Sequence, residues 1–344
     1  MLATATPGAA MNLLELPPIS APLPWQGEAW NRLQEQLESG QLPHALLLAG
    51  PADIGKARLA LALARLLLCH APVAGHNCGT CPGCRYSQSG SHGDFRWLQP
   101  EGKSKVIKIE QIRDAVAFAF RTASFGRRKV LVLAPAEAMT TNAANALLKC
   151  LEEPAGDTHI ILACERLQGV PATVRSRCQL LKLPLPPTTQ CLPWLDHLTG
   201  TREASADLLH LAAGMPLRAE RLYRESGSDS LQARHAGLQA LAAGEPAVAR
   251  VVSLFSQLDL ALALEEIALF LQQHLRQQRA ATLPDCRDHF HLLDRLQRLR
   301  GAVAAGSNPN PQLVLESALM GLRDCFGKPQ GNATMATRTG GIQT

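Results

Sequence analysis

The sequence contains no apolar run approaching the roughly 20 residues that a membrane-spanning helix requires, so no membrane partner is expected. Residues 1–24 have neither a basic start nor a sustained apolar core, and they do not resemble a secretory signal. Without an export signal, the expected compartment is the cytoplasm. In that reducing environment the ten cysteines are expected to be thiols or metal ligands rather than disulfides.

Charged and aromatic residues are also few. Charged residues make up 18% of the 344 residues, aromatic residues 4% and hydrophobic residues 46%, which is typical of a globular chain with two or three domains. The net charge of only +5 permits contact with nucleic acid but suits a solvated surface better. It argues against one candidate function, a zinc-dependent nucleic-acid-binding module. Phe118, Phe120 and Phe125 are expected in a core rather than as a base-stacking surface.

A nucleotide-binding loop lacks the residue that would hold its metal ion. Residues 50–56 (GPADIGK) follow an apolar run over 45–49 and precede a helical pattern over 57–68, which is the context of a phosphate-binding P-loop. Ala57 stands where the motif requires Ser or Thr, so the hydroxyl that would bind Mg²⁺ is absent. Three other residues of the motif are retained. Together with the backbone N–H groups of the loop, they would still allow weak nucleotide binding. These three are Gly50, Gly55 and Lys56.

The acidic residues of such a site are missing as well. The buried strand expected over residues 130–133 should end in a metal-binding acid and a catalytic acid, but Ala134 and Pro135 follow it. Neither side chain can coordinate a metal ion or orient a water molecule. The sequence therefore predicts the fold of an ATPase without its hydrolytic chemistry. The alternative is that an acid at another position, such as Glu137, takes over the missing catalytic role.

Alternating strand and helix patterns predict an α/β domain over residues 24–185, with a parallel sheet covered by helices. The expected strands are 45–49, 94–99, 106–109, 130–133, 159–163 and 179–183, and the expected helices are 25–40, 57–68, 111–122 and 141–153.

Prolines at 184, 186 and 187 then mark a domain boundary, beyond which no strand pattern recurs. Residues 186–228 are predicted to form a small helical domain. Residues 229–328 have apolar residues three and four apart, which predicts an all-helical bundle. The segments 1–23 and 329–344 are expected to be disordered. Met1 and Met11 are both candidates for the first residue of the protein.

Four cysteines lie within an insertion at residues 69–92. Cys69, Cys78, Cys81 and Cys84 have the spacing C-x8-C-x2-C-x2-C, with glycines and prolines between the last three that allow tight turns. Zn²⁺ takes four thiolates tetrahedrally, and its binding would stabilise the fold of the insertion. The spacing predicts a structural zinc site, and the alternative is four unligated thiols.

Three further segments, together with the loop, resemble the bacterial clamp-loader branch of the AAA+ family. They are residues 145–154 (NALLKCLEEP), 173–178 (TVRSRC) and 308–313 (NPNPQL). In that family the corresponding segments are the helix after Walker B, a Ser-Arg-Cys motif and a loop of the C-terminal collar. The resemblance covers about residues 24–328. It implies an AAA+ P-loop domain with a zinc insertion, a helical lid and an all-α collar that joins subunits.

Two branches of that family differ in their nucleotide motifs. The motor subunits, gamma and tau, keep them intact, whereas the delta-prime branch has the same fold with these motifs decayed. Ala57, Ala134 and Pro135 make the chain similar to the delta-prime branch. The resemblance implies a subunit of the DNA polymerase III holoenzyme, which transfers nucleotides to DNA, and no ATP hydrolysis by this chain. The implied partners are the gamma/tau and delta subunits and, through the complex, the sliding clamp and primed DNA.

The resemblance also implies roles for single residues. Arg177, next to Cys178, would reach into the ATP site of a neighbouring subunit as an arginine finger, although spacing alone favours a surface arginine paired with a carboxylate. Arg175 is the second candidate for this role. Arg218 resembles a sensor-2 arginine and equally fits an exposed helical position. Cys164 stands at the sensor-1 position, where a thiol orients a phosphate poorly.

The main alternative is an enzyme. A gamma-type ATPase of weak activity would use Lys56 together with Glu137, and turnover by the isolated chain would distinguish it from a subunit without ATPase activity. The nucleic-acid-binding module would instead show tight, salt-sensitive binding to DNA.

Overall fold

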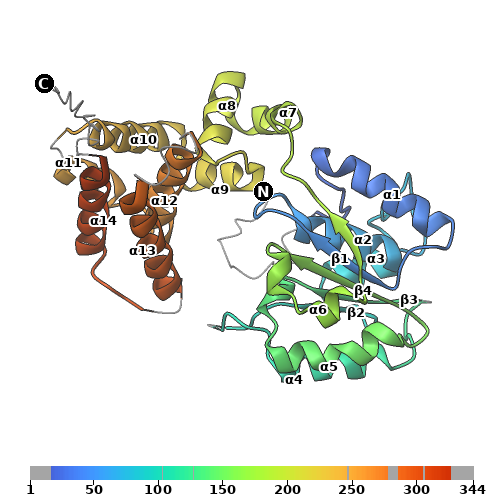
Figure 1. The fold of residues 1–344 in the computed structure, drawn as a ribbon. Helices are drawn as coiled ribbons and strands as arrows, with labels where there is room; N and C mark the ends of the chain where they lie inside the picture. The colour runs from blue at the N-terminus through green and yellow to red at the C-terminus, as the bar shows by residue number, and fades with distance from the viewer. Residues whose placement is uncertain are drawn as a thin grey trace, which may run out of the picture. The chain divides into compact units, whose positions relative to one another are not determined.

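The computed structural model describes residues 17–102, 104–126, 128–245, 248–277, 286–304 and 307–326. The chain divides into two compact units, with the boundary between Ser228 and Asp229 (Figure 1). Among the helices in these ranges, none has the length and apolar character that crossing a bilayer requires. The predicted tail at residues 329–344 lies outside the described residues.

The first unit is built on a five-stranded parallel sheet with the strand order β2-β3-β4-β1-β5. In register, Leu47 of β1 lies opposite Leu162 of β4 and Leu180 of β5. The strands are largely buried apolar runs, as expected where helices cover both faces of a parallel sheet. Their bounds are β1 Ala45–Ala49, β2 Phe95–Leu98, β3 Arg128–Leu133, β4 Asp157–Cys164 and β5 Gln179–Lys182.

Helices cover the two faces of this sheet, and alternate residues of each strand enter opposite cores. Leu47 and Leu131 pack with α4 and α5, whereas Leu46 and Leu48 pack with α1 and α2, so the sheet is the middle of three layers (Figure 1). The predicted α/β class and its parallel sheet are confirmed. The helices are α1 Gly27–Glu38, α2 Lys56–Leu68, α3 Pro82–Gln88, α4 Ile109–Ala119, α5 Thr141–Glu152 and α6 Ala172–Arg175, with short 3-10 turns at Pro24–Gln26, Ala136–Ala138 and Leu167–Gly169.

The strand expected over residues 106–109 is not formed. Ile107 makes a single parallel bridge to Met139, and α4 begins two residues later, where the side chain of Gln111 accepts a hydrogen bond from the Lys108 N–H at 2.9 Å. Ile107 is fully buried. The apolar residues around position 107 therefore do not indicate a strand. Ile107 itself packs in the core, and the helix cap at Lys108 ends any extended segment there.

Two phenylalanines expected in a core lie at the surface. Phe118 is buried, but Phe120 and Phe125 are 41% and 42% exposed. Because α4 ends at Ala119, the helical period no longer directs later residues toward the sheet. Phe125 instead makes an edge contact with Tyr86 of α3, with ring centroids 4.6 Å apart.

Residues 17–23 are bound to the body of the first unit, so the expectation of disorder is wrong for them. The fully buried Arg65 of α2 donates from Nη1 to the Pro17 carbonyl at 2.6 Å and to the Ser20 hydroxyl at 2.7 Å. The Ser20 N–H donates to Oδ1 of Asn77 at 2.9 Å. A buried guanidinium requires acceptors, and this segment supplies them. The rest of the predicted N-terminal extension, residues 1–16, lies outside the described residues.

In the described part of the chain, three helices complete the first unit after the sheet, and five lie in the second unit. The core of the second unit gathers around Phe255, Leu264, Leu271 and Leu319, and the predicted helical C-terminal region is confirmed. The helices of the first unit are α7 Thr188–Thr199, α8 Arg202–Leu211 and α9 Pro216–Ser226, and those of the second are α10 Ser228–Ala242, α11 Val248–Phe255, α12 Leu260–Gln277, α13 Arg287–Ala304 and α14 Pro311–Phe326.

Candidate functional site

The P-loop connects the end of β1 to the start of α2, as predicted. Its two glycines have packing roles of their own. A Cβ on Gly50 would lie 2.2 Å from the Leu183 carbonyl oxygen, and one on Gly55 would lie 2.3 Å from the side chain of Leu23. Gly55 also has φ +90°, a left-handed conformation that favours glycine. Both glycines are therefore explained by the backbone fold without a bound phosphate.

Lys56 is turned onto the loop itself. Its Nζ donates to the Pro51 carbonyl oxygen at 2.5 Å, and the side chain is only 7% exposed. Burial lowers the pKa of this ammonium, and the neighbouring carboxylates of Glu165 and Glu137 oppose that effect. The lysine that would bind phosphate in an active P-loop is thus satisfied by an atom of its own loop.

Asp53, at the tip of the loop, is bound to two arginines of α9. Its carboxylate accepts from Arg221 at 3.1 and 3.3 Å and forms an ion pair with Arg218 at 3.2 Å. Its carbonyl accepts from the Leu217 N–H at 3.1 Å. Burial alone would raise the pKa of Asp53, but Arg221 and then Arg218 outweigh this and hold it below its ordinary value.

Arg218 is only 9% exposed, so the alternative of an exposed helical arginine is wrong. The structure brings this sensor-2 candidate to the P-loop, where its partner is a carboxylate of the protein. Arg221, one turn further along α9, lowers the pKa of that carboxylate more than Arg218 does.

The positions expected to carry the acids lie at the carboxyl end of β3, and the sensor-1 position lies at the carboxyl end of β4. Ala134 and Pro135 follow β3, and the side chain of Glu137 accepts from the backbone N–H groups of Glu165 and Arg166 at 2.8 and 3.2 Å. One oxygen of this carboxylate therefore holds the turn after β4. Cys164 is fully buried at the end of β4, and burial raises its pKa to about 11, which keeps the thiol neutral.

Arg177 follows the short helix α6, just before β5. Its guanidinium forms an ion pair with Glu152, with Nε 2.6 Å from Oε1, and Nη1 donates to the Thr173 carbonyl at 2.9 Å. The arginine side chain is 34% exposed and the glutamate 48%. In the isolated chain, Arg177 is therefore a surface arginine paired with a carboxylate. Both partners come from the segments that carry the family resemblance.

The four cysteines of the insertion converge on one point. Their Sγ atoms all lie within 4.8 Å of one another, and the pairs Cys69–Cys81 and Cys78–Cys84 are each 3.9 Å apart. A tetrahedral zinc ion with Zn–S bonds of about 2.3 Å requires sulfurs about 3.8 Å apart. The donor set therefore fits such an ion, and these residues could hold a metal. Among the described residues, this is the one group of three or more potential ligands gathered so closely.

Hydrogen bonds orient these sulfurs. Backbone N–H groups donate to Sγ of Cys69, Cys78 and Cys81 at 3.3–3.4 Å, and the amide of Asn77 donates to Cys84 at 3.4 Å. Such donors stabilise the thiolate form and fix ligand orientation. Backbone N–H groups lower the pKa of Cys78 to about 5, whereas burial raises the pKa of Cys69 to about 12.

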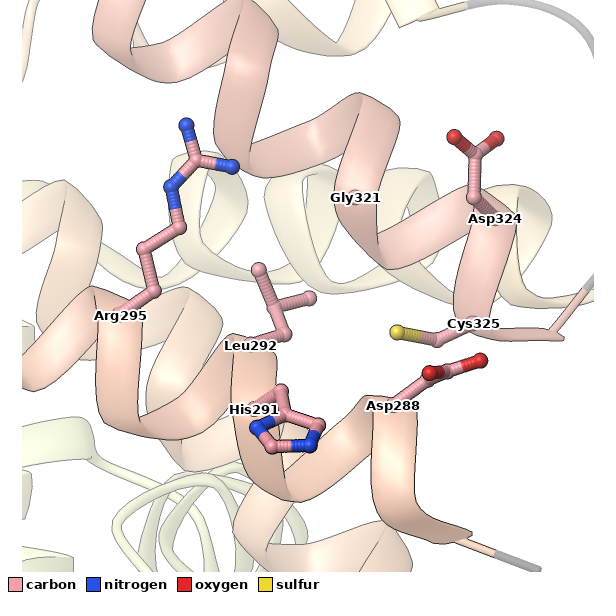
Figure 2. A pocket seen from close by; sticks show the side chains of 7 residues that line it. All are labelled: Asp288, His291, Leu292, Arg295, Gly321, Asp324 and Cys325. Carbon is pink, nitrogen blue, oxygen red and sulfur yellow. The ribbon is translucent and has the colours of Figure 1, made fainter.

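A pocket in the second unit lies between α13 and α14 (Figure 2). Leu292 forms its apolar floor, Asp288 and Asp324 lie at one end, and Arg295 lies at the other, where it donates to the Ser317 hydroxyl at 2.8 Å. The charges of both signs are spread around the rim, and they do not converge on a common point. The remaining lining residues are His291, Gly321 and Cys325.

Sequence reasoning did not identify Asp53, Arg221 or Glu152 as members of the site. Asp53 stands inside the P-loop motif at a position where the motif accepts any residue. Arg221 lies three residues after Arg218, on the same face of a helix, which is a signal that could have found it. Glu152 lies in the helix whose sequence carries the resemblance, but its partner is 25 residues away.

Comparison with known proteins adds to this geometry. The family model described as DNA polymerase III, delta subunit, matches residues 25–187. The chain is 45% identical over 202 residues to the DNA polymerase III subunit delta' of Pseudomonas aeruginosa, covering 58% of this chain and 61% of that protein. It is 36% identical over 224 residues to the subunit of the same name from Escherichia coli, covering 65% and 66%.

A crystal structure of a DNA polymerase III gamma subunit-related protein from Thermotoga maritima is also similar. It has a TM-score of 0.49 and 19% identity, over 86% of this chain and 99% of that one. The matches to the curated relatives span 61% and 66% of those proteins' length, and both relatives carry the name delta-prime. Together with the parallel sheet and the altered P-loop, these matches support a delta-prime clamp-loader subunit of DNA polymerase III.

Proposed function

We propose that this chain is a subunit without ATPase activity in a sliding-clamp loader, and that it provides Arg177 to the ATP site of a neighbouring gamma/tau subunit. In that complex, which would also contain delta, it would support placement of the clamp on primed DNA during replication. The observation that carries the proposal is the state of the chain's own P-loop. Its lysine binds Pro51, and its aspartate binds two arginines.

The chain's own site lacks the groups that hydrolysis requires. Ala57 offers no hydroxyl for Mg²⁺, and Ala134 and Pro135 offer no carboxylate. Hydrolysis by a P-loop protein depends on a metal ion held by such groups and on a positioned water. ATP turnover by this chain is therefore not expected.

Arg177 is suited to act outside the chain. Its ion pair with Glu152 is partly exposed on both sides, and such pairs contribute about 0–1 kcal/mol. An arginine finger that contributes roughly 10³–10⁵ in rate stabilises a transition state by about 4–7 kcal/mol. Exchange of Glu152 for the phosphates of a neighbouring site would therefore cost little compared with what the finger supplies.

The cysteine cluster would hold a structural Zn²⁺ through Cys69, Cys78, Cys81 and Cys84. The ion would join the end of α2 to the start of α3, because its four ligands come from the end of α2, a turn and the start of α3. The helices of the second unit would form the oligomerisation collar, and the complex would act in the cytoplasm.

The test is a reconstituted clamp loader that carries Arg177→Ala. We expect assembly to be unchanged and DNA-stimulated ATPase and clamp loading to fall, because one neighbouring site loses its cation. Arg175→Ala is the comparison variant, because Arg175 is the second candidate for the finger, and a loss of loading with Arg175→Ala alone would assign the role to Arg175. Normal loading by the Arg177→Ala complex would refute the role of Arg177.

Two other functions make different predictions for the isolated chain. A gamma-type ATPase would hydrolyse ATP with Mg²⁺, and Lys56→Ala would abolish that turnover. A nucleic-acid-binding module would bind DNA tightly, with an affinity that falls steeply as salt rises. The proposed function predicts neither activity.

A further inference from the structure

Helix α9 is held on the P-loop by a network of ion pairs among the chain's own side chains. Arg218 and Arg221 are 9% and 6% exposed, and both guanidinium groups face the carboxylate of Asp53. A second set of contacts lies beside the first: Glu220 pairs with Arg58 of α2 at 3.1 Å and with Arg224 at 2.9 Å.

We propose that Asp53 is a built-in anionic ligand that occupies Arg218 and Arg221 and thereby closes the P-loop to phosphate. The carboxylate supplies to the two arginines what the phosphate of a bound nucleotide would otherwise supply. The chain's own side chains thus hold α9 against the loop through Asp53.

The physical argument concerns buried charge. Two guanidinium groups removed from water require a counter-charge within contact distance, since an unpaired buried charge is destabilising by several kcal/mol. Asp53 meets this requirement with two hydrogen bonds from Arg221 in a fork arrangement and an ion pair from Arg218, which is the geometry that guanidinium groups favour with carboxylates and phosphates alike.

A phosphate group that entered the loop would meet an occupied site. It would have to displace Asp53 from both arginines and then lie beside the displaced carboxylate, and like charges at such a distance repel each other. Lys56 donates to the Pro51 carbonyl, and its charge already acts on Asp53, whose pKa it helps to lower. The backbone fits this role, because Asp53 has φ +55°, a conformation that Asp and Asn tolerate better than other side chains.

The proposal is tested by titrating the full-length protein with inorganic pyrophosphate in a calorimeter. Asp53→Asn removes the charge and keeps a residue that accepts positive φ, and Asp53→Gly is a second variant that removes the whole side chain at a position glycine also accepts. Asp114→Asn, at an exposed position of α4, is the control for the change in net charge. Circular dichroism verifies that each variant is folded.

We expect Asp53→Asn to bind pyrophosphate at least tenfold more tightly than the wild type and than Asp114→Asn. Adding Arg221→Ala to Asp53→Asn should remove this gain. The proposal is overturned if the wild type binds as tightly as the variant, because its arginines would then not be occupied. It is also overturned if neither folded Asp53 variant binds, because the released arginines would then form no anion site. None of these outcomes depends on Arg177, so the proposed function is tested separately.

Discussion

Removing the carboxylate of Asp94 should destabilise the first unit strongly. Asp94, immediately before β2, is fully buried, and it accepts hydrogen bonds from the backbone N–H groups of Ser124 and Phe125 at 2.7 and 2.6 Å. Lys129, only 4% exposed, lies 3.6 Å from the same carboxylate and 4.1 Å from the centre of the Phe118 ring. One side chain thus satisfies two backbone donors and one buried ammonium.

The size of the effect follows from these contacts. Each buried N–H left without an acceptor costs about 1–3 kcal/mol, and removal of one partner from a buried ion pair costs about 3–5 kcal/mol. Because the same carboxylate serves both purposes, the two contributions overlap. We expect Asp94→Ala to lower the free energy of unfolding by about 3–5 kcal/mol, a large part of the about 5–15 kcal/mol that stabilises a typical domain. In the double variant with Lys129→Met the ammonium is absent, so the combined loss should be smaller than the sum of the single losses by about 0.5–3 kcal/mol.

Urea unfolding followed by tryptophan fluorescence measures this effect in the first unit. All four tryptophans lie there, at positions 25, 30, 97 and 194, so the signal reports that unit alone. Asp114→Ala removes an exposed aspartate of α4 and should change the free energy of unfolding by less than about 0.5 kcal/mol. A loss of under 1 kcal/mol for Asp94→Ala would refute the reasoning.

The same network predicts a dependence on pH. Burial by itself would raise the pKa of Asp94, but the N–H groups of Ser124 and Phe125 and the charge of Lys129 hold it below its ordinary value of 3.8. A carboxylate whose pKa is lower in the folded state contributes stability above the unfolded pKa and loses it as the pH falls through the folded value. The difference in stability between the wild type and Asp94→Asn should therefore be constant near pH 7 and shrink as the pH falls below 3.8.

Two further predictions concern the metal site and the second unit. Purified protein should contain one zinc ion per chain by elemental analysis, and either a strong chelator or Cys84→Ser should remove it and make the remaining cluster thiols reactive, whereas Cys150→Ser should leave the zinc content unchanged. In the second unit, Glu266 and Arg234 form a buried pair at 2.6 and 2.7 Å, so Glu266→Gln should destabilise by about 3–5 kcal/mol, seen as faster hydrogen exchange in α10 and α12. Asp294→Asn, in an exposed pair of α13, should leave that exchange unchanged.

Local patterns predicted the helices and strands whose buried apolar residues recur at a regular spacing along the sequence. The buried runs of β1 and β3 and the helical pattern of α2 were readable because a strand between two layers of helices is apolar on both faces. The segment around Ile107 could not be assigned in the same way. A single buried anchor and a short strand have the same local composition, and only the position of Met139 in the fold distinguishes them.

The residues of the candidate site also fall into a group that local patterns predicted and a group that they did not. The cluster of four cysteines was predicted from spacing because short turns within one insertion bring their sulfurs together. The partners of Asp53 and Arg177 were not, because those contacts join residues separated by 168 and 25 positions. Which carboxylate meets which guanidinium depends on how α9 and α5 pack, and no short-range pattern records that.

By itself, the sequence determined the α/β class, the cluster of four cysteines and the loss of the groups that bind Mg²⁺ and activate water, since each depends on residue type at a local position. Only the tertiary structure decided that Lys56 and Asp53 are engaged by the protein's own atoms and that Arg177 is paired with Glu152 at the surface. Buried charges form ion pairs between elements that folding brings together. The energy of such a pair depends on the distance between the two groups in space and not on their separation along the chain.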